Sequence, residues 1–134
     1  FIRGKADGKW YFLETSSRVG GAHIPDLVEA SSGINIWREW AKIEDALLRN
    51  KSYEVAKPTG FSAGLIIALA KELKPDYAEF ECEEVVRFLQ IDYHVGIVYK
   101  SDKMEMVQQR LDEAAEKIND HHLNILPQKS KPSS

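Results

Sequence analysis

Cysteine is nearly missing from this sequence: Cys82 is the single one in 134 residues, so no disulfide can form within the chain. Few cysteines are typical of reducing compartments, and we therefore expect a cytoplasmic location. Long apolar runs are missing as well. The longest, residues 63–70, is far shorter than the roughly 18 residues of a membrane-spanning helix. The sequence therefore predicts no membrane partner.

A basic stretch interleaved with aromatic residues is also missing. The 21 acidic residues outnumber the 18 Lys and Arg, which gives a formal net charge of −3. This balance argues against a nucleic-acid partner. The 43% of apolar and 29% of charged residues are ordinary for a globular protein of one domain. We expect that domain to span residues 1–126, with a disordered tail at 127–134, because "PQKSKPSS" has no apolar member.

Local signals predict the elements of the first half of the chain. Asp7-Gly8 is a hairpin turn signal, and Trp10–Glu14 alternates like a strand. A proline near the start and Gly33 at the end predict a helix over Ile24–Ser32.

A second helix is predicted over about Ile36–Arg49, with Asn35 as its N-cap. Its apolar residues recur at helical spacing and form a wide stripe, which we expect to be buried. The tryptophans of this helix, Trp37 and Trp40, are expected to pack in the core.

The second half of the chain contains the clearest strand, Tyr93–Lys100, in which apolar residues alternate. Residues 63–70 fit either a buried strand or a short helix, since periodicity cannot separate the two, and the Leu-Ile-Ile run slightly favours a strand. Glu83–Gln90 is predicted to be a short helix, and residues 102–119 a longer one.

The predicted fold class is α+β, with a mostly antiparallel sheet covered by helices. Strands 10–14 and 93–100 should belong to the sheet, and helices 36–49 and 102–119 should cover it. Asp102 and Glu105 resemble a capping box at the start of the last helix. The expected buried residues of that helix are Met104, Val107, Leu111 and Ile118.

Candidate site residues cluster after the first predicted strand. Glu14 should lie at its carboxyl end, on the same face as Trp10, with Ser16 and Arg18 just beyond it. Two interpretations stay open: a surface ion pair between Glu14 and Arg18, or a carboxylate and a guanidinium that together face a charged ligand. Gly20-Gly21 follow and precede a helix whose amino end favours an anion, although the lysine and spacing of a P-loop are missing.

The remaining candidate groups carry weaker signals. His121 and His122 are adjacent, so on a helix they diverge by about 100° and do not easily share a metal ion. His23 precedes a helix and His94 lies on a strand, and structural or surface roles are favoured for all four histidines. Cys82 has no motif beside it and is expected to be inert.

Two longer stretches carry a resemblance to a known family. "FLETSSRVGGAHIPDLVEASSGINIWREWAKIE" resembles the last catalytic strand and following helices of ATP-grasp enzymes. These have Glu-x-Asn-x-Arg at a strand end, a glycine-containing loop, a helix, and then a Gly-Ile step into another helix, here Gly33-Ile34-Asn35-Ile36. "HVGIVYKSDKMEMVQQRLDEAAEKI" is similar to the strand and helix that close the carboxyl-terminal subdomain. The resemblance covers most of residues 10 to 119 and implies the carboxyl-terminal portion of an ATP-grasp fold.

The resemblance implies a reaction and assigns roles in it. In such enzymes ATP phosphorylates a carboxylate, and an amine or another nucleophile then displaces phosphate from the acyl phosphate. Glu14 would hold Mg²⁺ with Ser16 as a second ligand, while Arg18 would grip the γ-phosphate or the acyl phosphate, with Gly20 and Gly21 at the substrate. The expected cofactor is therefore Mg²⁺. The expected partners are ATP and a small carboxylate, and a homo-oligomer is left open.

Departures from the family pattern keep rival interpretations open. Ser16 replaces the family's Asn, and its shorter side chain puts the second metal ligand in question. Where biotin carboxylases have Gln and Glu, this chain has Gly20 and Ala22, so a carboxylate–amine ligase is the better match. The adenine-binding region is expected before Phe1, which makes the chain a carboxyl-terminal fragment that is inactive alone. The rivals are a catalytically degenerate ATP-grasp domain that serves as a binding module, and an unrelated α+β interaction domain.

Overall fold

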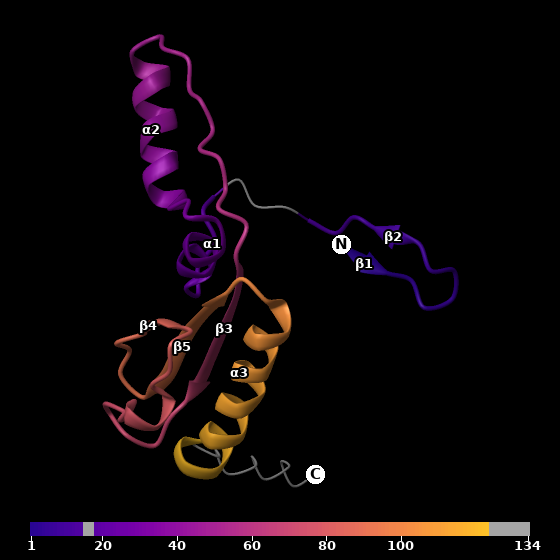
Figure 1. Cartoon of the computed structure of the whole chain (residues 1–134). Helices are drawn as coiled ribbons and strands as arrows, with labels where there is room; N and C mark the ends of the chain where they lie inside the picture. The colour runs from indigo at the N-terminus through magenta and orange to yellow at the C-terminus, as the bar shows by residue number, and fades with distance from the viewer. Residues whose placement is uncertain (15–17, 124–134) are drawn as a thin grey trace, which may run out of the picture.

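The computed structural model describes residues 1–14 and 18–123 and has an α+β architecture (Figure 1). Ser16 and the expected tail at 127–134 lie outside these residues. Within the described ranges, no helix is long and apolar enough to cross a membrane. The elements in chain order are β1 (Ile2–Arg3), β2 (Trp10–Tyr11), α1 (Ile24–Ser32), α2 (Ile36–Leu48), β3 (Ser62–Leu69), a 3₁₀ turn η1 (Ala78–Phe80), β4 (Val85–Phe88), β5 (His94–Ser101), α3 (Met104–Lys117) and a π-helical turn η2 (Ile118–His122).

A three-stranded antiparallel sheet of order β3-β5-β4 forms the centre of the fold. The predicted strand 93–100 is confirmed to within one residue, and the segment 63–70 is a strand, β3. Alternate residues of β5 are buried on the face toward α3: Val95, Ile97 and Tyr99 belong to one apolar cluster. Because β5 is the middle strand and covered on both faces, its opposite-facing Val98 is buried as well.

Helix α3 lies against β3 and β5, as Figure 1 shows. A methyl group at Gly64 of β3 would lie 2.7 Å from Val107, so this glycine lets the helix approach the sheet closely. Val107 and Ile118 are buried as predicted, but the prediction for Met104 was wrong, since it is 61% exposed. The capping box was also wrong: the helix begins after Lys103, which makes no side-chain cap.

The prediction of a helix over Glu83–Gln90 was wrong, because this segment contains strand β4. A bulge between Val85 and Arg87 places both Val86 and Arg87 opposite Val98, and Phe88 then returns to the core face. The two inward residues, Val85 and Phe88, are therefore three apart in the sequence, which is also the spacing of a helix.

The predicted strand Trp10–Glu14 exists only at Trp10–Tyr11, and it does not join the central sheet. It pairs with β1 in a separate two-stranded hairpin, closed by the predicted Asp7-Gly8 turn (Figure 1). The apolar side chains of this hairpin are exposed, so burial could not extend the strand to Glu14.

Helix α1 has the predicted bounds and α2 ends one residue before the predicted end, because local signals decide their ends. Gly33 adopts the left-handed conformation, φ 73°, at the end of α1, and Asn35 caps α2 by accepting a hydrogen bond from Arg38 N at 3.0 Å. The expected burial of α2 was wrong. No described residue of α2 is buried, and its stacked Trp37 and Trp40 are 52% and 41% exposed. Helix α1 is the one of these two helices that packs extensively on the sheet, against β3 and β5.

Helices α1 and α3 cover opposite faces of the sheet. Arg87 of β4 pairs in register with Val98, whose side chain points away from the α3 face. The Arg87 guanidinium binds the Asp26 carboxylate of α1, so α1 lies on that second face. This ion pair ties the first turn of α1 to the edge strand β4.

Candidate functional site

The predicted metal ligand Glu14 is exposed, three residues after the last residue of β2. It forms no ion pair or hydrogen bond with any other residue in the described parts of the chain. Arg18 is also exposed, and its Nη1 donates to the Val19 carbonyl at 3.3 Å. Over residues 1–14 and 18–123, no group of three or more His, Cys, Asp or Glu side chains is placed to hold a metal ion. Among the described residues, no ion pair joins Glu14 to Arg18.

Packing explains the absence of a side chain at Gly20 but not at Gly21. A methyl group at Gly20 would lie 3.3 Å from the Ile24 side chain, so packing accounts for this glycine. A methyl group at Gly21 would meet nothing within 4 Å, and Gly21 does not have a positive φ. Gly21 instead leaves its backbone open on one side, while its carbonyl accepts a hydrogen bond from Ile24 N at 3.0 Å.

An open hollow of about 270 Å³ lies where this loop enters α1. Both glycines line it, so the loop that follows Arg18 leads directly into it. Asn35 and Trp37 close its other side from the start of α2. The hollow is therefore built from three short segments, which the Gly33 turn brings together.

A hydrogen-bonded chain of three side chains, His23, Asp26 and Arg87, borders this hollow. His23 Nδ1 lies 2.8 Å from Asp26 Oδ2, and the second oxygen of Asp26 binds Arg87. Since an ionised carboxylate only accepts, the proton of this bond is on Nδ1. His23 and the preceding Ala22 both have left-handed backbone conformations, φ 59° and 50°, which turn the imidazole back toward Asp26.

The charged side chains that line the hollow are acidic. They are Asp26 and Glu29, the first bound by Arg87. Glu29 accepts a hydrogen bond from Asn35 Nδ2 at 2.9 Å and has the exposed Arg38 guanidinium 3.8 Å away. These contacts fix both carboxylates in place. The hollow thus combines an imidazole, two carboxylates and an indole.

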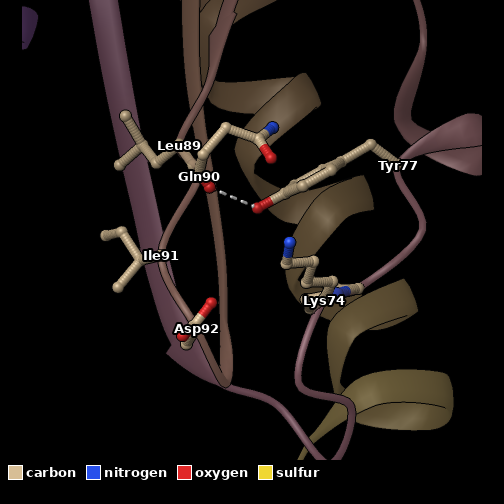
Figure 2. Close-up of a pocket in the computed structure, with 7 residues that line it drawn as sticks. Lys74, Tyr77, Leu89, Gln90, Ile91 and Asp92 are labelled. Atoms are coloured by element: carbon tan, nitrogen blue, oxygen red, sulfur yellow. Dashed lines mark hydrogen bonds between the residues drawn. The ribbon is translucent and has the colours of Figure 1, made fainter.

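A second pocket, of about 160 Å³, lies at the far end of the sheet between β4 and β5 (Figure 2). Tyr77 bonds here to two backbone groups. Its hydroxyl donates to the Leu89 carbonyl at 2.8 Å and accepts from Gly96 N at 3.2 Å. Lys74 and Asp92 lie at its rim and are both exposed (Figure 2). The Tyr77 hydroxyl already bonds to backbone groups, so this pocket offers a ligand mainly the exposed side chains at its rim.

The adjacent histidines at the end of α3 meet one carboxylate rather than a metal. His122 is buried, and its Nε2 lies 2.8 Å from Glu79 of η1, while His121 Nδ1 lies 3.1 Å from the same carboxylate. The contact with His122 lowers the pKa of Glu79. Glu72 lies 3.4 Å from the other nitrogen of His122. This cluster ties η2 to η1 and to the end of β3.

The ion pairs of Arg110 on the α3 face of the sheet also stabilise the fold rather than form a binding site. Arg110 of α3 binds Glu84 and Glu113 at 2.9 and 2.8 Å, and its hydrogen bond lowers the pKa of Glu84. Burial raises the pKa of the neighbouring Cys82 thiol and of the Tyr99 hydroxyl. A thiol held in its protonated form is a poor nucleophile, which agrees with the expectation that Cys82 is inert.

Comparison with known proteins does not add to this geometry. No protein-family model, curated protein or solved structure matches this chain. The assignment of the site therefore rests on its residues.

The structure brings together only part of the predicted site. Gly20 and Gly21 share the hollow, Arg18 stands two residues before it, and Glu14 lies across the segment 15–17 that contains Ser16. Sequence reasoning missed the group of His23, Asp26 and Arg87. The spacing His-x-x-Asp at a helix start was a usable local signal for the first two. The third is 61 residues from Asp26, and no local pattern could have indicated it.

Proposed function

We propose that this chain is the carboxyl-terminal part of an ATP-dependent, Mg²⁺-requiring ATP-grasp ligase that joins a carboxylate to an amine or a thiol. ATP phosphorylates the carboxylate, and the nucleophile then displaces phosphate from the acyl phosphate. Glu14 and Ser16 supply oxygen ligands of the kind that Mg²⁺ prefers, and Arg18 supplies a guanidinium for the transferred phosphoryl group.

The observation that carries this proposal is the loop from Glu14 to α1. Glu14 is exposed and unpaired among the described residues, which leaves its charge available to a ligand. The glycine at position 21 is explained neither by packing nor by backbone conformation, and its backbone is open to close approach. A carboxylate, an arginine and an open glycine follow one another between residues 14 and 21 of the chain, and these are groups that phosphoryl transfer needs.

Further support comes from the surfaces around this loop. The β1–β2 hairpin exposes Trp10 and Tyr11, and α2 exposes Trp37 and Trp40. Apolar surface of this extent suits an interface with further protein. A longer enzyme, whose ATP-binding residues lie outside this sequence, would supply such a cover.

A second candidate is a catalytically degenerate ATP-grasp domain that acts as a binding or assembly module. Ser16 in place of the family's Asn favours it, since the second metal ligand is shortened. The two candidates differ in turnover but not in fold.

Glu14→Gln and Arg18→Lys in the complete gene product test the proposal. Glu14→Gln keeps size but removes the charge that holds Mg²⁺, so ADP formation should fall by about two decades or more, on the order of 3 kcal/mol. Raising Mg²⁺ should partly restore it, because the loss is in metal occupancy. Arg18→Lys keeps the charge but loses the planar fork, so turnover should fall with little rescue by Mg²⁺.

Glu54→Gln is the matched control, because Glu54 is exposed and lies outside the loop. It should leave ADP formation and its Mg²⁺ dependence unchanged. Wild-type turnover of Glu14→Gln at limiting Mg²⁺ would contradict the role of Glu14 as a metal ligand. A wild-type protein that binds Mg-ATP and never releases ADP would favour the binding module.

A further inference from the structure

We infer that the hollow at the start of α1 binds the amine nucleophile of the ligase, with His23 as the general base that removes its proton. The inference rests on the proposed function and adds to it a substrate class and a residue.

The tautomer of His23 is set by its surroundings. Asp26 Oδ2 accepts the hydrogen bond from Nδ1 at 2.8 Å, so a neutral imidazole has its lone pair on Nε2. Nε2 makes no hydrogen bond to any described residue, and the side chain is 35% exposed. A base needs an accessible nitrogen without a proton, and this geometry provides one.

Asp26 is a positioning residue in this arrangement. Its side chain is only 18% exposed, and Arg87 of β4 holds its second oxygen. The carboxylate therefore cannot rotate away from His23 without breaking an ion pair that reaches across to the sheet. An imidazole oriented by a fixed carboxylate is the arrangement by which proteins select one tautomer.

The lining of the hollow favours an ammonium group as the ligand. Asp26 and Glu29 line it with carboxylates, and the guanidinium groups that pair with them, of Arg87 and Arg38, are not among its lining residues. The indole of Trp37 lines it as well and is half-exposed, so a cation can lie against the ring. An amine substrate that arrives protonated must lose a proton before it can attack, which explains why a base belongs in the same place.

The proposed step balances without any further reactant. The ammonium group first gives one proton to His23 Nε2. The neutral amine nitrogen then attacks the carbonyl carbon of the acyl phosphate, and a C–N bond forms. The C–O bond to the phosphoryl group breaks, and phosphate leaves with its electron pair and takes the second proton from the nitrogen. Arg18, two residues before the hollow, holds the phosphate side in the proposed function, and the imidazolium returns its proton to water.

The test compares two nucleophiles in the complete gene product. Hydroxylamine is uncharged at neutral pH and needs no base, whereas an alkylamine is protonated. His23→Gln should lower ATP-dependent amide formation from the alkylamine by about 10²-fold or more, and hydroxamate formation should stay close to the wild-type rate. His94→Gln, which removes an imidazole outside the hollow, should leave both rates unchanged.

The second measurement does not depend on activity. Nitrogen NMR of this chain should show His23 with its proton on Nδ1, and Asp26→Asn should abolish that preference. A proton on Nε2 would overturn the inference, and so would equal loss of amide and hydroxamate in His23→Gln, or no loss of amide. Absence of hydroxamate in the wild-type protein would overturn the proposed function and this inference with it, whereas the other outcomes overturn the inference alone.

Discussion

The substitution Tyr77→Phe removes the hydroxyl group of Tyr77, which lies beside the backbone of Leu89 (Figure 2). The hydroxyl bridges the last rung between β4 and β5, since it accepts from Gly96 N at 3.2 Å and donates to Leu89 O at 2.8 Å. The ring itself should stay in place, because it stacks on Phe88 with centroids 4.6 Å apart. The substitution therefore changes hydrogen bonding and leaves packing intact.

The expected cost follows from the burial of the Gly96 amide. The Leu89 carbonyl keeps its hydrogen bond from Ile91 N at 3.1 Å, so the variant leaves one buried group, the Gly96 N–H, without its partner. A buried unsatisfied group costs about 1–3 kcal/mol. The adjacent pocket of about 160 Å³ is open to water, which can offset part of this loss, so we expect about 1–2 kcal/mol of lost stability. At about 2 cal/mol/K per residue, this is a fall in Tm of roughly 4–8 °C.

Urea unfolding and hydrogen exchange of the Gly96 amide measure this effect. Tyr93→Phe is the matched control, because Tyr93 is 52% exposed and its hydroxyl bonds to no other described residue. Tyr93→Phe should leave stability nearly unchanged. The reasoning would be refuted if Tyr77→Phe matched the control in stability, or if the Gly96 amide stayed as protected as in the wild-type protein.

Two further predictions concern the α3 face of the sheet. Gly64→Ala places a methyl group 2.7 Å from buried Val107. Urea unfolding should therefore show that the free energy of unfolding falls by about 1–3 kcal/mol. Gly21→Ala is the control, because a methyl group there has open space around it, and it should leave the free energy of unfolding unchanged. The pKa of Glu84 is lowered by Arg110, so its ion pair stabilises the fold above the ordinary pKa of the carboxyl and is lost as pH falls. Arg110→Gln should therefore reduce the fall of Tm between about pH 6 and pH 3, and an unchanged acid profile would show that this pair is not responsible.

Local sequence rules determined the elements whose ends depend on one or two residues. Gly33 ends α1 because it adopts a positive φ, and Asn35 starts α2 because its side chain accepts from the first turn. The Asp7-Gly8 turn and strand β5 follow from equally local patterns. For the same reason Glu14 and Arg18 could be selected from the sequence as candidates, although their surroundings could not.

Only the tertiary structure decided which faces are buried and which distant groups meet. The apolar stripe of α2 predicted burial, yet Trp37 is exposed because α1 occupies the sheet face instead. The bulge in β4 gave a strand the spacing of a helix, and only pairing with β5 resolves that ambiguity. The contact of Asp26 with Arg87 joins residues 61 apart. Periodicity reports which residues prefer to leave water, but the partner that covers them is a property of the whole packed chain.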